Sequence, residues 1–97
     1  MDNDETIIRK AAATATSIDI KYKRASPTDK VILKPERDKA FSVYAASRLK
    51  LLEAGTVSSS DDVAEMAEIR RQVAHARKQQ SLIVAIGRFV GFLAKFA

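Results

Sequence analysis

The sequence predicts an all-α fold: an antiparallel helical hairpin with a long C-terminal helix, dimerising into a helical bundle. Three observations support this. Apolar residues recur at helical spacing over much of the chain, cap motifs mark two helix starts, and only 3 Gly and 2 Pro interrupt the 97 residues. This length allows one domain, which buries so little surface that a dimer would add stability. We expect residues 26–97 to form the hairpin domain, preceded by an arm.

Residues 1–25 are expected to form a flexible or extended N-terminal arm. The arm contains a low-complexity run of alanine and threonine at residues 11–16. After this run Ile18, Ile20 and Tyr22 alternate with charged residues, which is the two-residue period of a strand. Because a single strand is not stable alone, the arm either remains flexible or pairs with its copy in a dimer.

The first helical region begins at Ser26-Pro27-Thr28-Asp29, where Ser26 is the candidate N-cap and Pro27 the first helical residue. Pro35 follows so closely that only a turn or short helix is expected over residues 27–33. The first long helix is then predicted from Pro35 to Ala54. Its apolar stripe has spacings of four, four and three and consists of Phe41, Ala45, Leu49 and Leu52.

The second long helix is predicted over residues 61–95, a length of about 50 Å. It contains a heptad-spaced stripe, the predicted dimer seam, in which small residues would allow a partner helix to approach closely. The seam comprises Ile69, Val73, Ala76, Gln80, Ile83, Gly87, Val90 and Ala94. A second apolar stripe, Leu82, Ile86, Phe89, Leu93 and Phe96, lies beside it. Since one preceding helix cannot cover both stripes, a homodimer is expected.

Composition gives little support for catalysis. The chain has no Cys and 1 His, so neither a thiol nucleophile nor a two-histidine metal site can form within it. His75 lies between cations with no nucleophile at a suitable spacing, and no phosphate-binding glycine motif is present. We therefore expect no enzyme activity, no cofactor, and no catalytic or metal-binding residues.

Targeting signals are also not evident. The acidic start, Met1 to Glu5, is unlike a secretory signal, and the apolar segment Leu82–Ala97 is too short and too charged to be read as a membrane span. A cytoplasmic location is expected. The same segment is compatible with three environments: the dimer core, a partner surface, or the surface of a membrane.

Direct nucleic-acid binding is the main alternative function. Basic residues cluster at 21–24 and again at Arg70, Arg71, Arg77 and Lys78, and such clusters can neutralise phosphates. However, the net charge of +5 is spread evenly along the sequence. This alternative is a small basic helical DNA-binding dimer, or a structural dimer associated with a plasmid or phage.

Two short motifs resemble the TraM-type antiactivators of bacterial quorum sensing, a family associated with conjugative plasmids. Pro27-Thr28-Asp29 is similar to the motif before that family's first long helix, and Gly91-Phe92-Leu93-Ala94-Lys95 is similar to its C-terminal segment. The resemblance implies a dimer of antiparallel helices that binds a LuxR-type transcriptional activator and blocks its DNA binding. The residues then expected to contact the activator are Arg77, Lys78, Arg88, Phe92 and Lys95.

Overall fold

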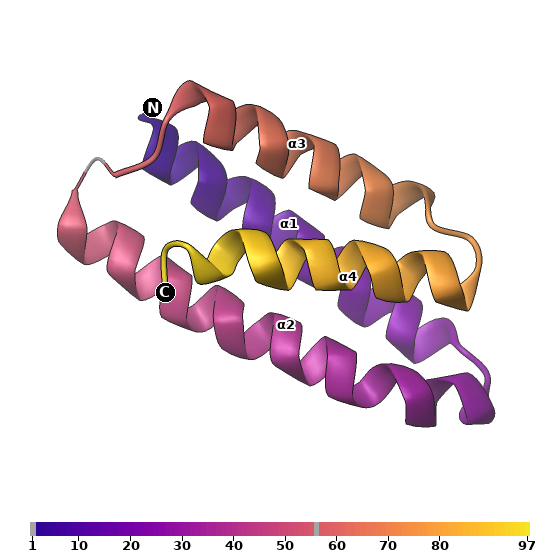
Figure 1. The fold of residues 1–97 in the computed structure, drawn as a ribbon. Helices are drawn as coiled ribbons and strands as arrows, with labels where there is room; N and C mark the ends of the chain where they lie inside the picture. Colours follow the sequence, from indigo (N-terminus) through magenta and orange to yellow (C-terminus); the bar gives the residue numbers. More distant parts are fainter. Residues whose placement is uncertain (1, 56) are drawn as a thin grey trace.

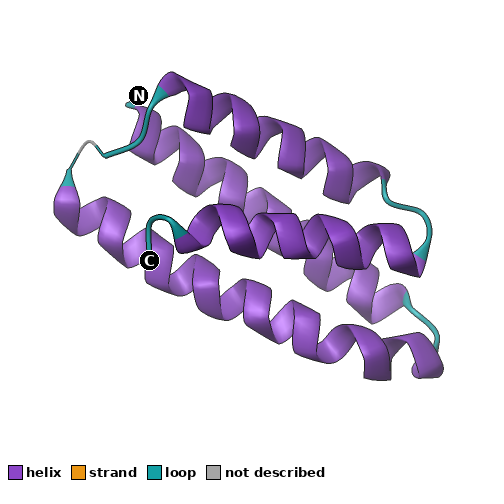
Figure 2. Ribbon diagram, in the orientation of Figure 1, coloured by secondary structure: helices purple, strands orange, loops and turns teal. Residues whose placement is uncertain are grey.

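The computed structural model describes residues 2–55 and 57–97, which form four α-helices joined by short connections (Figure 1). These are α1 (Asn3–Arg24), α2 (Pro27–Ala54), α3 (Ser60–His75) and α4 (Gln79–Ala94). No strand occurs in the described residues (Figure 2), which confirms the all-α prediction. The helices are four rather than the two of the predicted hairpin.

Consecutive helices run antiparallel along an elongated body of 41 × 21 × 18 Å (Figure 1). Helix α1 packs against α2 and α3, and α4 packs against the same two helices, so α1 and α4 lie on one diagonal. The α1–α2 and α3–α4 connections therefore lie at the same end of the bundle, and the α2–α3 connection crosses the opposite end (Figure 1).

The prediction of an extended or flexible arm over residues 1–25 is wrong where the structure describes them, because Asn3–Arg24 form α1; Met1 lies outside the described residues. The side chain of Asp2 caps the helix by accepting a hydrogen bond from the backbone N–H of Glu5. Alanine favours helix, and the buried residues Ile7, Ala11 and Ile18 follow the helical period. Ile18 is fully buried while Ile20 is 44% exposed, so their alternation did not indicate a strand.

Helix α2 begins at Pro27, eight residues earlier than the predicted long helix, and Ser26 caps it by accepting from the N–H of Asp29. Pro35 lies inside this helix. A proline frees the carbonyl four residues before it, here that of Val31. Both Pro35 and Val31 are exposed, so water can satisfy the freed carbonyl. Gly55 ends the helix with a φ of 80°, a conformation that other residues rarely adopt.

The predicted long helix over residues 61–95 is broken at residues 76–78. Ala76 and Lys78 have extended backbones that end α3 and begin α4. No glycine or proline marks this break in the sequence. Its physical reason lies in packing, because the chain can then fold α4 back and bury the second apolar stripe internally.

The core draws on all four helices. Its largest fully buried side chain is Phe89 of α4, which shares the core with fully buried side chains of α1, α3 and α4. These are Ile7, Ile18, Met66, Ile69, Val73, Ile86 and Leu93. Leu33, Ala40 and Leu51 line the α2 face of the core. The core is therefore completed within one chain.

Candidate functional site

A cavity of about 430 Å³ lies at the end of the bundle that carries the α1–α2 and α3–α4 connections. Four basic side chains line it: Lys21 and Arg24 from the end of α1, and Arg77 and Lys78 from the α3–α4 connection. We call it the cationic cavity. The fold thus brings together two basic clusters that are more than 50 residues apart in the sequence, which sequence reasoning alone did not connect.

The lining cations are largely uncompensated. Lys21 Nζ donates a hydrogen bond of 2.9 Å to the carbonyl oxygen of Ala76, which ties α1 to the end of α3. Within residues 2–55 and 57–97, none of the four cations forms an ion pair. The lining includes one carboxylate, Asp29, in the first turn of α2.

The N-terminus of α4 borders the same cavity through Gln79, its first residue. No side chain caps this helix, and its first turn contains no acidic residue. By contrast, Asp2, Ser26 and Ser59 cap the other three helices. Gln79 also has a buried side-chain nitrogen, Nε2, without a hydrogen-bond partner.

Charge is concentrated in the half of the bundle that holds this cavity. When each helix is divided near its midpoint, residues 14–40 and 68–86 form that half. They contain eleven basic and five acidic side chains, while the rest of the chain contains six basic and seven acidic ones. The positive charge that looked evenly spread along the sequence therefore gathers at one end of the fold.

The residues expected to contact a partner do not form one patch. Arg77 and Lys78 border the cationic cavity, Arg88 is exposed midway along α4, and Lys95 follows its C-terminus. Lys95 donates to Asp62 Oδ1 at 3.2 Å. The 16 residues of α4 place its two ends about 24 Å apart. Phe92 is 3% exposed and belongs to the core of the chain. The prediction that its side chain contacts a partner is therefore wrong.

The predicted dimer seam is divided between the core and the surface. Ile69 and Val73 are fully buried inside the chain, so the prediction that they pack against a second copy is wrong. Ala76, Ile83 and Val90 are half-buried, and Gln80, Gly87 and Ala94 are exposed on the outside of α4. Only this outer part remains accessible to another molecule.

The apolar stripe predicted for the first long helix lies on the outside of α2. Phe41, Leu49 and Leu52 are 37%, 57% and 60% exposed, and Ala45 is exposed between them. The guanidinium of Arg37 lies 5.4 Å from the ring centroid of Phe41 and 5.1 Å from that of Tyr22, so one end of the stripe borders α1. We call these four residues the α2 stripe.

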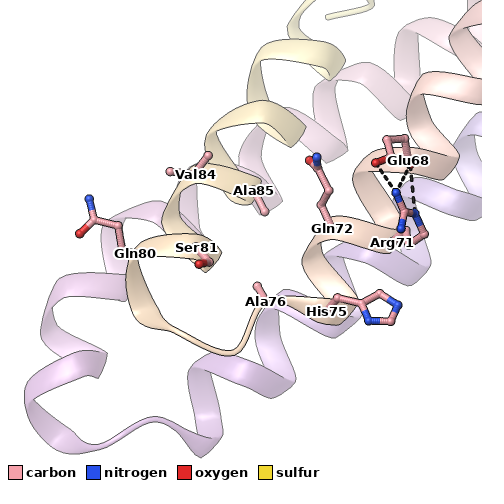
Figure 3. Close-up of a pocket in the computed structure, with 9 residues that line it drawn as sticks. All are labelled: Glu68, Arg71, Gln72, His75, Ala76, Gln80, Ser81, Val84 and Ala85. Atoms are coloured by element: carbon pink, nitrogen blue, oxygen red, sulfur yellow. Dashed lines mark hydrogen bonds and ion pairs between the residues drawn. The ribbon is translucent and has the colours of Figure 1, made fainter.

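A second cavity, of about 500 Å³, lies between α3 and α4 (Figure 3). Its rim carries the ion pair between Arg71 and Glu68, with a shortest N–O distance of 2.6 Å. Hydrogen bonds from Arg71 lower the pKa of Glu68. His75 and Ser81 both line this cavity, but the imidazole points away from α4 (Figure 3) and no hydrogen bond joins the two within the described residues. They do not form a nucleophile–base pair in this geometry.

Neither a metal centre nor a membrane span is found in the described parts of the chain. No three of their His, Asp or Glu side chains gather as potential metal ligands. None of their helices has the length and apolar character needed to cross a bilayer. Comparisons with protein families, curated proteins and solved structures find no match to this chain.

Proposed function

We propose that this protein is a non-catalytic protein-binding module, and that its partner contributes an apolar helix that packs on the α2 stripe. The observation that supports this proposal is that exposed apolar side chains gather on α2. Five of the eight large hydrophobic side chains with high exposure in the described residues belong to α2. Three of these, Phe41, Leu49 and Leu52, lie on the stripe.

The spacing of the stripe suits a helical partner. Its residues recur every three or four positions along about 16 Å of helix, which is the pattern of anchors that one helix presents to another. The core is already complete without them, so these side chains are available for binding. A net charge of +5 on each copy opposes self-association, which favours a different protein as the occupant.

The α2 stripe can be tested with the variant Leu49→Gln/Leu52→Gln. Ile32→Gln is the matched control, because Ile32 is 48% exposed on the same helix but nearly opposite Leu52 around its axis. A pull-down followed by calorimetry should show binding that weakens at least about tenfold in the double variant and is unchanged in the control. Equal binding by both variants would contradict the proposal.

In a more specific form, we propose that the partner is a LuxR-type activator whose DNA binding is blocked. This form rests on the two short resemblances, at Pro27-Thr28-Asp29 and at Gly91–Lys95. Adding the purified protein to an activator–operator complex should release the DNA in proportion to the protein added. DNA that stays bound under saturating protein would exclude the antiactivator role but not binding of another partner.

We also propose that two copies of the chain can dimerise through the outer face of α4. The residues of this face are Ile83, Gly87, Val90 and Ala94. Sedimentation equilibrium distinguishes this dimerisation from the binding of a different protein. A monomer at every concentration would exclude it. A dimer that dissociates in Leu49→Gln/Leu52→Gln would instead assign the α2 stripe to self-association.

Nucleic-acid binding is a second candidate, supported by the concentration of basic residues at one end of the bundle. Binding that depends on phosphate contacts weakens steeply with salt, by orders of magnitude over a modest range when several contacts form. A gel-shift series with increasing salt therefore tests it. Absence of a shift at low salt would exclude it.

A further inference from the structure

We infer that the cationic cavity binds a small anion that carries a phosphate group, such as a phosphate monoester. This site lies on α1, the start of α2 and the α3–α4 connection, away from the α2 stripe. It therefore does not depend on the proposed protein-binding function.

Positive charge surrounds the cavity. Lys21, Arg24, Arg77 and Lys78 converge on one concave space, and no ion pair neutralises them in the parts of the chain that the structure describes. Like charges held around a cavity raise its positive potential and attract anions. The one lining carboxylate, Asp29, lies in the first turn of α2, where the partial positive charge of the helix N-terminus already compensates it.

Hydrogen-bond donors add directional contacts to this charge. The first backbone N–H groups of a helix have no partners within the helix, and α4 lacks the side-chain cap that the other three helices have. The N-terminus of a helix is a favourable position for a phosphate. Gln79 supplies a further donor, because Nε2 is unpartnered in the side chain that lines the cavity.

Size and chemistry point to a small ligand. A volume of about 430 Å³ falls in the range of small-molecule sites. Arg24 and Arg77 each offer a planar guanidinium that can bind a phosphate through two parallel hydrogen bonds. Four cations around one concave space match the two negative charges of a phosphate monoester better than the extended backbone of a duplex, which would contact the outer surface.

The test is titration of the folded protein with inorganic phosphate and with glycerol phosphate at low ionic strength, followed by calorimetry and amide NMR. We expect saturable binding, with shifts in the amides of Gln79, Gln80 and Ser81 at the start of α4. Arg77→Gln and Arg24→Gln should each weaken binding by roughly tenfold. The control is Arg48→Gln, an exposed cation in the other half of α2, which should leave the affinity within about twofold.

Three results would overturn the inference. The first is a lack of saturable binding of either anion. The second is an equal loss of affinity in Arg48→Gln, which would mean that net charge alone attracts the anion. The third is binding of phosphatidic acid vesicles or duplex DNA that free glycerol phosphate does not displace, which would assign the basic end to a surface interaction rather than to the cavity. Displacement of vesicles by glycerol phosphate would support the inference and identify a lipid headgroup as one source of the anion.

Discussion

Asp4 is a carboxylate that is only 4% exposed, and it holds two distant parts of the chain together. It accepts hydrogen bonds from the backbone N–H groups of Val57 and Ser58 and from the Ser58 hydroxyl. These bonds attach the start of α1 to the α2–α3 connection. In the sequence Asp4 is one of several acidic residues near the N-terminus. No sequence feature distinguishes this buried carboxylate from that of its neighbour Glu5, which is exposed.

Replacing Asp4 should therefore destabilise the bundle. Asp4→Ala leaves two backbone N–H groups without their acceptor, and hydrogen bonds to charged groups contribute about 1.5–3 kcal/mol each. We expect a loss of at least about 2 kcal/mol in the free energy of unfolding, measured by urea denaturation. Glu5→Gln, the neighbouring control, should change it by less than about 0.5 kcal/mol. Equal stability of the two variants would contradict the role of Asp4.

Asp19 gives the structure a dependence on acid pH. Hydrogen bonds from Lys23, at 3.0 Å, and from Arg37, at 2.9 Å, hold the pKa of Asp19 below its ordinary value of 3.8. A carboxylate with a lowered pKa in the folded state stabilises the fold above its ordinary pKa. That contribution is lost as the pH falls through the lower, folded value.

The change Asp19→Asn tests this dependence. The variant should have a lower urea midpoint than the parent protein at neutral pH, because Arg37 and Lys23 lose their ion pairs with Asp19. The difference between the two midpoints should shrink as the pH is lowered below 3.8. A difference that stays constant down to the acid transition would show that the ion pairs are not its source.

At the scale of the helices, periodicity identified the apolar stripes but not which stripe faces the core. In α2 the regular stripe lies outside, while Leu33, Ala40 and Leu51 face inward. In α4 the second stripe, with Leu82 and Phe89, is buried. A period of 3.6 shows that a helix is amphipathic, but the facing direction depends on the neighbouring helices. Those neighbours could not be known from the pattern, because residues 1–25 were predicted as an arm and α3 and α4 as one continuous helix.

Adjacent leucines in α2 provide a direct check of its orientation. Leu51 is 3% exposed and Leu52 is 60% exposed. Leu51→Ala should lower the free energy of unfolding by about 2–5 kcal/mol, since truncating a buried leucine loses burial and leaves a cavity. Leu52→Ala should lower it by less than about 1 kcal/mol. The reverse order, measured by urea unfolding, would mean that α2 is rotated about its axis.

Gly87 tests how the outer face of α4 is used. A Cβ placed at Gly87 would meet nothing within 4 Å, so packing within the chain does not require glycine there. Alanine is favoured over glycine inside a helix by about 1 kcal/mol. Gly87→Ala should therefore raise the melting temperature of the isolated chain. A lower melting temperature, together with loss of a dimer in sedimentation, would instead show that glycine serves close contact with another molecule.

At the scale of the whole molecule, the sequence was informative about helix content but not about where distant residues meet. The cap predicted at Ser26 is confirmed. The cap predicted for the second helical region at Ser60, Asp61 or Asp62 is wrong, because Ser59 caps α3 and Asp62 is the third residue of its capping box. The cationic cavity depends on a break at residues 76–78 that has no glycine or proline signal. It also depends on α3 returning to the end of the bundle where α1 finishes, so no local pattern could place Arg24 near Arg77.

The largest consequence of the four-helix arrangement concerns residues 2–25. A flexible arm could be removed without loss, but α1 contributes Ile7, Ala11, Ala15 and Ile18 to the core, each at most 2% exposed. Without α1, the buried faces of α2 and α3 that pack against it would be open to water. Losing the burial of these side chains costs several kcal/mol, which is comparable to the net stability of a typical small domain, about 5–15 kcal/mol. The chain from residue 26 onward should therefore not fold cooperatively alone, and its thermal unfolding should lose the sharp transition of the full chain.

Adding a synthetic peptide of residues 2–25 should restore that transition, whereas a scrambled peptide of the same composition should not. A shortened chain with the full chain's melting temperature would show that α1 is not an integral part of the bundle.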